Sequence, residues 1–182
     1  MKAVVIYDSL GGNTEKAAVR IHHALMAGQL DVDLIKVNDE TEIDFYHYDL
    51  IFMGSPVISW EPTKAMKTLV KGKMKDYRDS HHLLPAAPLR PGKFAVCFCT
   101  YGGPHTGTAE AVPLTKWLRA FFEHLGYLVV DEWHVVGQFH KNEEMNTQGR
   151  MGDISGRPND NDLRDIENRV KGVLSYLSAW LT

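Results

Sequence analysis

The sequence has few cysteines, no long apolar run and no large excess of charge of either sign. Of its 182 residues only Cys97 and Cys99 are cysteines, and they are too close together for a useful disulfide, which argues against a secreted disulfide-rich domain. No apolar stretch approaches the roughly 20 residues of a membrane-spanning helix, and the N-terminal apolar run at 3–7 is shorter than the about 7–15 residues of an export signal. Twenty Lys and Arg against 23 Asp and Glu leave a net charge of −3, whereas a nucleic-acid-binding domain is expected to be strongly basic. We therefore expect a cytoplasmic protein that binds no nucleic acid and enters no membrane.

The composition and length are those of an ordinary globular domain. Apolar residues make up 44% and charged residues 24% of the chain, close to globular averages, and the length fits one domain spanning residues 1–182. Two segments, at about 75–92 and 137–158, are longer than ordinary connections, whose median is about 4–6 residues. We expect these segments to be functional loops, interface loops or mobile excursions.

Short β-branched runs alternate with segments of helical periodicity. One such helix carries Leu114, Leu118 and Phe121 on one face and ends before Gly126. The predicted strands cover residues 3–7, 32–37, 50–53, 94–99 and 127–136. Because strands that alternate with helices require right-handed crossovers, the pattern predicts an α/β fold in which a five-stranded parallel sheet lies between two layers of helices.

The turn after the first strand, Ser9-Leu10-Gly11-Gly12-Asn13-Thr14, has the composition of a phosphate-binding loop. A helix that begins there offers unpaired N–H groups and the positive end of its dipole, and the glycines allow close approach of the backbone. The Gly-Lys-Ser/Thr of a nucleoside-triphosphatase loop and the G-x-G-x-x-G of a dinucleotide-binding loop are both absent. A cradle without Lys or Arg suits a small phosphorylated cofactor that stays bound. The alternative is a glycine-rich turn in which Asn or Thr caps the helix.

The motif Ser9-x-x-Gly12-Asn13-Thr14 resembles the FMN-phosphate loop of the flavodoxin family, and two further segments match by position. Gly54-Ser55-Pro56 resembles the first flavin-ring loop of that family, and Thr100 to Pro104 resembles the second. The resemblance implies a three-layer fold with strand order 2-1-3-4-5 and FMN as cofactor. It assigns FMN contacts to Ser9, Leu10, Gly11, Gly12, Asn13, Thr14, Ser55, Pro56, Val57, Ile58, Trp60, Thr100, Tyr101, Gly102, Gly103 and His105.

Aromatic side chains on the two flavin-ring loops are the expected ring contacts, because a flat apolar ring is best held between aromatic planes. Trp60 and Tyr101 occupy these loops, although Trp60 is also consistent with a helix-entry residue and Tyr101 with a partly exposed loop residue. His105 is a candidate to donate a proton near the ring, with an ordinary surface histidine as the alternative. The paired histidines at 22–23 and 81–82 lack metal-ligand spacing, so we expect no metal site.

The sequence departs from the resemblance in the first flavin-ring loop. Many flavodoxins have glycine after the loop aromatic, where a peptide flip stabilises the one-electron-reduced flavin. Here Glu61 follows Trp60 and precedes Pro62, and a residue before proline is confined to extended conformations. We therefore expect weak stabilisation of the one-electron state and two-electron chemistry.

Three functions fit these features. The first is an FMN-binding redox protein that carries electrons between partner proteins, and the second is an FMN-dependent NAD(P)H:quinone or flavin oxidoreductase. The third is a module of the same fold that has lost FMN and serves only in binding. Residues 61–93 hold eight Lys and Arg against three Asp and Glu, which is either a solvated helix face or a docking surface for an acidic partner or for NADPH phosphates. The segment 137–158 could instead cover the flavin site of a neighbouring subunit in a homodimer, with Arg150 and Arg157 reaching a phosphate or carboxylate.

Overall fold

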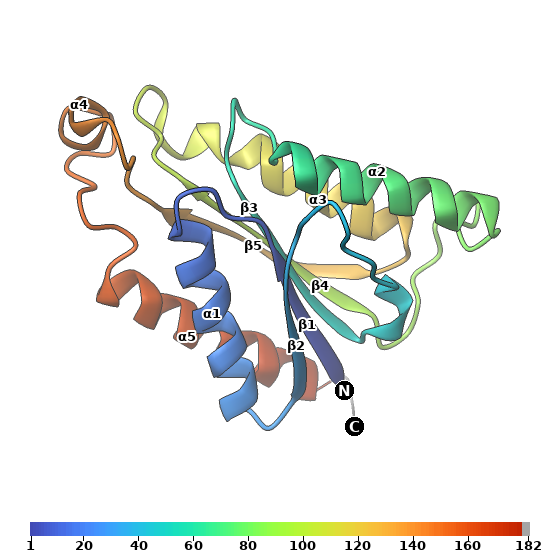
Figure 1. Cartoon of the computed structure of the whole chain (residues 1–182). Coiled ribbons are helices and arrows are strands. Elements are labelled where there is room, and N and C mark those ends of the chain that lie inside the picture. The colour runs from blue at the N-terminus through green and yellow to red at the C-terminus, as the bar shows by residue number, and fades with distance from the viewer. Residues whose placement is uncertain (180–182) are drawn as a thin grey trace.

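Five strands and the helices between them make up the described part of the chain, residues 1–179 of a computed structural model (Figure 1). The strands are β1 (Lys2–Tyr7), β2 (Asp31–Lys36), β3 (Leu50–Pro56), β4 (Phe94–Tyr101) and β5 (Leu128–Val136). The helices are α1 (Asn13–Ala27), α2 (Lys64–Asp79), α3 (Val112–His124), α4 (Glu143–Thr147) and α5 (Asp160–Ser178), with 3-10 turns at Phe45–His47 and Gly107–Glu110.

All neighbouring strands pair in parallel, in the order β2-β1-β3-β4-β5. The expected α/β sandwich with strand order 2-1-3-4-5 is therefore confirmed. Two strands extend further than the sequence indicated, because β3 continues to pair with β4 through Ser55 opposite Cys99 and Pro56 opposite Thr100. Ser55, Pro56, Thr100 and Tyr101 consequently belong to strand ends and not to free loops.

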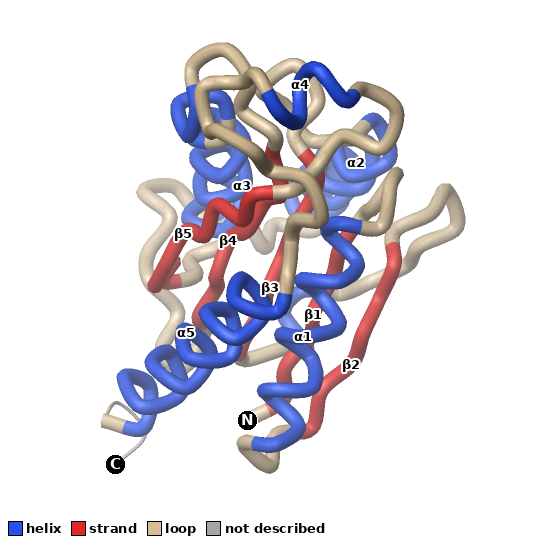
Figure 2. The backbone as a smooth tube through the Cα atoms, turned by 90° about the vertical axis from the view of Figure 1, so that its left-hand side faces the viewer, coloured by secondary structure: helices blue, strands red, loops and turns tan. Residues whose placement is uncertain are grey.

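The sheet buries a separate apolar core on each face. Helices α1 and α5 cover one face, where Phe52, Phe98 and Trp133 are enclosed, and α2 and α3 cover the other, where Phe45 and Phe122 lie (Figures 1 and 2). Burial on both faces explains why the central strands read as continuous apolar runs. The layers leave free the edge at which the strands end, and Figure 2 shows the loops and α4 gathered above it.

Both long connections are less irregular than the sequence indicated. Helix α2 continues to Asp79, so the first irregular connection begins at Ser80 and not near residue 75. The second connection contains α4 and rejoins the fold at α5, where Asn159 and Asp162 form a capping box. Within residues 1–179, no helix is both long enough and apolar enough to cross a membrane.

Candidate cofactor site

The candidate site lies at the carboxyl edge of the sheet, beside the boundary between β1 and β3 where the strand order reverses (Figure 2). Ligands of open parallel sheets bind at this position, because the loops on either side diverge and leave a crevice. A cavity of about 390 Å³ opens there, within the usual size of about 300–1,000 Å³ for a small-molecule site. A second cavity of about 280 Å³ adjoins it and shares Val57, Tyr101 and Phe139 with it.

The structure brings most of the sequence-predicted site residues together on the larger cavity. These are Ser9, Leu10, Gly11, Asn13, Thr14, Pro56, Val57, Ile58, Thr100, Tyr101 and Gly102. Trp60, Gly103 and His105 line the adjoining cavity instead. Gly12 and Ser55 line neither cavity, and both support the conformation of the loops that do.

The loop after β1, Ser9–Thr14, is called the first loop, and it presents backbone N–H groups. Among the described residues, no hydrogen bond uses the amide of Leu10, Gly11, Asn13 or Thr14, and the last two begin α1. The Ser9 hydroxyl instead organises the turn, since it accepts from the amides at Gly12 (3.1 Å) and Glu15 (3.3 Å). Free amides at the positive end of a helix dipole form an anion site.

Gly12 sets the path of this loop. Its φ of +91° lies in the left-handed region that favours glycine, and no described atom lies within 4 Å of where its Cβ would stand. The N-cap of α1 is therefore this glycine, with no side-chain cap, in contrast to the Asn or Thr cap that the sequence left open.

Two polar side chains of the loop are engaged with other parts of the fold. The Thr14 hydroxyl lies 2.7 Å from the Thr100 hydroxyl, and both residues are buried, so this contact couples the first loop to β4. The Asn13 amide nitrogen donates to the carbonyl of Gln138 at 2.8 Å. The Asn13 side chain thus holds the segment after β5 and is not directed at a ligand alone.

A buried network braces the first loop against the end of β3. The Thr63 hydroxyl donates to Asp8 Oδ2 (2.5 Å) and accepts from the Met66 amide (3.3 Å), which caps α2. The other Asp8 oxygen accepts from the Ser9 amide, and the fully buried Ser55 hydroxyl accepts from the Thr63 amide. Ser55 thus supports the site without reaching the cavity.

The first flavin-ring loop, which begins at Gly54-Ser55-Pro56, continues into a tight turn from Ile58 to Glu61. The two end residues exchange both backbone hydrogen bonds, at 2.9 and 3.0 Å, while Ser59 (φ 48°) and Trp60 (φ 69°) occupy the left-handed region. These values are typical of a type I′ turn, which normally uses Asn-Gly at the two central positions. Trp60 stands at the tip with 61% of its surface exposed, where it can cover a flat ring.

Tyr101 does not stand free in its loop. The residue is only 6% exposed, and its hydroxyl lies 2.9 Å from the Thr108 hydroxyl, although it lines both cavities. His105 lines the adjoining cavity and its main-chain N–H donates to Glu110. The ring contact of Tyr101 and the proton-donor role of His105 both stay predictions.

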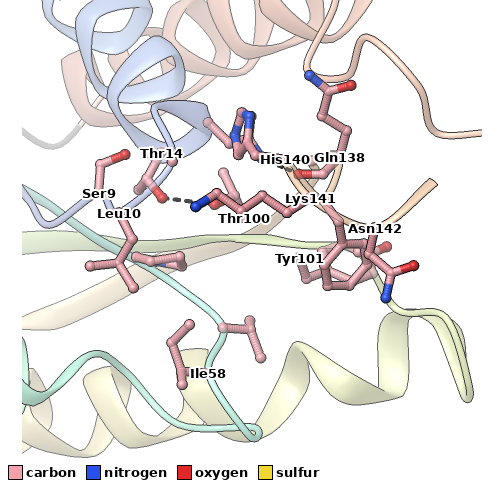
Figure 3. Close-up of a pocket in the computed structure, with 17 residues that line it drawn as sticks. Ser9, Leu10, Thr14, Ile58, Thr100, Tyr101, Gln138, His140, Lys141 and Asn142 are labelled. Atoms are coloured by element: carbon pink, nitrogen blue, oxygen red, sulfur yellow. Dashed lines mark hydrogen bonds between the residues drawn. The ribbon is translucent and has the colours of Figure 1, made fainter. Parts of the chain in front are cut away.

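Sequence reasoning missed the segment directly after β5. Gln138, Phe139, His140, Lys141 and Asn142 all line the larger cavity, and Figure 3 shows the Lys141 side chain reaching across it toward Thr14 and Thr100. The loop at 9–14 contains no Lys or Arg, as the sequence indicated, but the lining of the cavity includes this lysine from another part of the chain. The signal available in the sequence was topological, because this segment leaves the carboxyl end of a strand at the same edge as the three loops.

Arg150 and Arg157 do not supply this charge, because neither lines the cavity and Arg157 pairs with Asp162. Residues 137–142 line the cavity of their own chain, and the covering of a neighbouring subunit in a homodimer stays a prediction.

Thiol and metal chemistry have no support in the described residues. Burial raises the pKa of the Cys97 and Cys99 thiols well above the ordinary value, so both stay protonated within the core. Residues 1–179 contain no group of three or more His, Cys, Asp or Glu side chains placed to hold a metal ion.

The remaining surfaces of the cavity fit a phosphorylated cofactor with a flat apolar ring. Free amides and the Lys141 ammonium offer an anion site at one end, and Leu10, Val57, Ile58 and Phe139 offer apolar contacts. A neighbouring exposed tryptophan adds an aromatic plane. Fold and site together define an α/β protein whose cavity at the switch point of the sheet has a lining that fits a phosphorylated cofactor with a flat ring.

The chain belongs to the flavodoxin family, whose model matches residues 5–130. Members of this family bind FMN as their cofactor. Two curated relatives share short stretches with the chain. The probable flavodoxin 1 of Bacillus subtilis is 35% identical over 54 residues, which is 30% of this chain and 34% of that protein. The flavodoxin-like domain-containing protein BilS of Clostridioides difficile is 39% identical over 56 residues, 30% of each chain, so these matches span about a third of either relative.

The solved structures extend the similarity of fold to the whole chain. Oxidised flavodoxin 1 from Bacillus cereus superposes with a TM-score of 0.68 at 18% identity, covering 96% of this chain and 98% of that one. A flavodoxin from the domain Archaea gives a TM-score of 0.62 at 19% identity and covers 98% and 99%.

Proposed function

We propose that this protein is an electron carrier that holds FMN in the cavity at the carboxyl edge of the sheet and exchanges electrons with partner proteins. The amides of the first loop and α1 hold the phosphate, and the ends of β3 and β4 with Trp60 hold the flavin ring. FMN supplies the redox chemistry, and the protein supplies its orientation, its electrostatic surroundings and its access to partners.

The observation that carries this proposal is the rim of the site. Leu10, Ile58, Trp60 and Phe139 have 71%, 46%, 61% and 37% of their surfaces exposed, and all four border one of the two adjoining cavities. Exposed apolar side chains that gather around a cofactor cavity are typical of a surface that another protein covers. A carrier needs such access, because electrons must pass between its flavin and a partner's redox group.

The surface of α2, next to this rim, is basic only in part. Of the lysines on α2, Lys67 pairs with Glu61 at 2.5 Å and Lys73 pairs with Glu42 at 2.8 Å. Lys64 and Lys71 form no ion pair with the described residues. Two such cations support weak attraction to an acidic partner and give little support to a dedicated site for NADPH phosphates.

The alternative function is an FMN-dependent NAD(P)H:quinone or flavin oxidoreductase. A hydride donor must lie flat on the flavin, which requires a second binding surface for its nucleotide half. Of the two arginines in the segment 137–158, Arg157 before the start of α5 is committed to Asp162, and neither Arg150 nor Arg157 lines the two cavities. This engagement favours the carrier over the oxidoreductase.

Spectroscopy under anaerobic conditions tests the proposal. The purified protein, loaded with FMN, should show the absorption of bound oxidised flavin. NADH or NADPH alone should bleach it slowly, whereas an added NADPH-dependent reductase protein should bleach it quickly. If the protein retains no flavin absorption after incubation with excess FMN and removal of the unbound FMN, the cofactor assignment is contradicted. Rapid bleaching by NADPH alone, followed by turnover with a quinone, contradicts the carrier role and supports the oxidoreductase.

A further inference from the structure

The segment after β5 is fastened to the site at its second residue, Gln138. Gln138 donates its amide to the carbonyl of Arg157 (2.8 Å), and its side-chain oxygen accepts from the Gly156 amide (2.8 Å). Its own carbonyl accepts from the side chain of Asn13 at 2.8 Å. The strand end, the first loop and the start of α5 are thereby tied together at one residue.

A buried asparagine fixes the next residue of the segment. Asn146 is 3% exposed, and its side chain accepts from the Phe139 amide (2.7 Å) and donates to the Phe139 carbonyl (2.9 Å). The Asn146 carbonyl in turn accepts from the amide of the buried Ile154. At Gln138 and Phe139 the segment is therefore a built wall of the cavity, because the backbone polar groups of these two residues are satisfied by fixed partners.

The wall closes directly over the glycine turn of the first loop. A Cβ on Gly11 would stand 2.3 Å from the His140 ring, so the loop and the wall are in contact at this point. The next residue, Lys141, extends across the cavity toward Thr14 and Thr100 (Figure 3).

Lys141 is electrostatically isolated in this position. It is the only Lys, Arg, Asp or Glu among the residues that line the cavity, and it forms no ion pair or hydrogen bond with the described residues. A phosphate monoester carries about −1.5 to −2 charges near pH 7. Amides of a helix terminus contribute only about +0.5 of a charge, which leaves most of the phosphate charge unbalanced.

We propose that Lys141 is a phosphate ligand supplied from the segment after β5, and that it makes the site selective for phosphorylated flavin. This inference rests on the proposed binding of FMN. The ammonium pairs with the phosphate from the side opposite the free amides of the first loop. A wall held by Asn146 and Gln138 presents the side chain, so the backbone that leads to Lys141 is placed before the ligand arrives.

Flavin-binding measurements on the apoprotein test this inference, because riboflavin carries the same ring as FMN and lacks the phosphate. Binding is followed by the change of flavin fluorescence for wild type, Lys141→Gln, Lys141→Arg and the matched control Lys171→Gln, which removes an exposed lysine on α5. We expect Lys141→Gln to weaken FMN binding about tenfold at low ionic strength, the size of one charge-assisted hydrogen bond on a surface-exposed lysine. Riboflavin binding should be unchanged, Lys171→Gln should match wild type, and Lys141→Arg should retain most of the FMN affinity.

Salt supplies a second measurement. Because the screening length falls from about 30 Å at 0.01 M to about 3 Å at 1 M salt, the effect of Lys141→Gln on FMN binding should shrink at high ionic strength. Equal FMN affinities of Lys141→Gln and wild type, or an equal loss of FMN and riboflavin binding, would overturn the inference. Failure of the proposed function gives a different result, in which wild type itself binds neither flavin.

Discussion

The hydroxyl of Thr63 lies where two supports of the site meet, and its removal gives a quantitative test of that role. It donates to the buried carboxylate of Asp8 at 2.5 Å and caps the first turn of α2 by accepting from the Met66 amide. Thr63→Val removes both interactions with nearly no change of volume. We expect the cap to be worth about 1 kcal/mol and a hydrogen bond to a carboxylate about 1.5–3 kcal/mol.

Together these losses predict that Thr63→Val lowers the free energy of unfolding by about 3 kcal/mol. That is a large part of the roughly 5–15 kcal/mol expected for a domain. Because the urea dependence of unfolding is about 1–3 kcal/mol per molar for small proteins, the midpoint should fall by roughly 1.5 M. The measurement is equilibrium urea unfolding of the apoprotein, followed by far-ultraviolet circular dichroism.

Thr63→Ser is the matched control, since serine keeps the hydroxyl and loses one methyl group, worth about 0.8 kcal/mol. A double-mutant cycle with Asp8→Ala should give a coupling energy of about 1 kcal/mol or more, because the two side chains are direct partners. The reasoning is refuted if Thr63→Val costs less than about 1 kcal/mol, or if Thr63→Ser is as destabilising as Thr63→Val.

Three further outcomes follow from other contacts. Gly54→Ala should destabilise the fold by about 1–3 kcal/mol in urea unfolding, because its Cβ would stand 2.2 Å from the Phe98 ring; a variant as stable as wild type would show that this ring moves freely. Burial alone would raise the pKa of Asp162, but hydrogen bonds from Arg157 and a backbone amide outweigh burial and hold that pKa below its ordinary value. Asp162 therefore stabilises the fold above about pH 4, and the stability difference between wild type and Asp162→Asn should shrink as pH falls below that value; a difference independent of pH would contradict this. Anaerobic reductive titration should show little one-electron-reduced flavin, because the Glu61 amide is held in its turn at 3.0 Å; a large and stable one-electron form would contradict the expectation.

Local sequence signals were sufficient for the strands and for the first loop, whereas the strand order was implied only by the family resemblance. The run at 3–7 is buried on both faces, as its lack of polar alternation indicated, and the glycines that follow leave the amides of α1 free. Each of these features depends on residues within one strand, one turn and one helix start. A pattern of that length is fully contained in a short stretch of sequence.

The position of Tyr101 shows where local signals end. A prediction that β4 stops at Cys99 places this tyrosine in a free loop, but pairing with β5 continues through Tyr101 opposite Val136. In a strand covered on both faces, residues of either parity are enclosed, so Thr100 and Tyr101 are 3% and 6% exposed. The length of a central strand depends on its neighbours and not on its own composition.

Lys141 shows a second limit of the same kind. No Lys or Arg stands between Ser9 and Thr14, so the loop itself supplies no cation. Lys141 lies more than 120 positions after this loop in the sequence. It lines the same cavity because β5 ends at the same edge of the sheet and the side chain of Asn13 contacts Gln138 there. Lys141 and its neighbours belong to no recognisable sequence motif. The hydrogen bonds between Asn146 and Phe139 hold this segment in place, and no hydrophobic periodicity predicts them. The charge at this site is therefore a property of the assembled edge, where four strand ends converge, and it becomes visible only when the connections beyond each strand are placed in space.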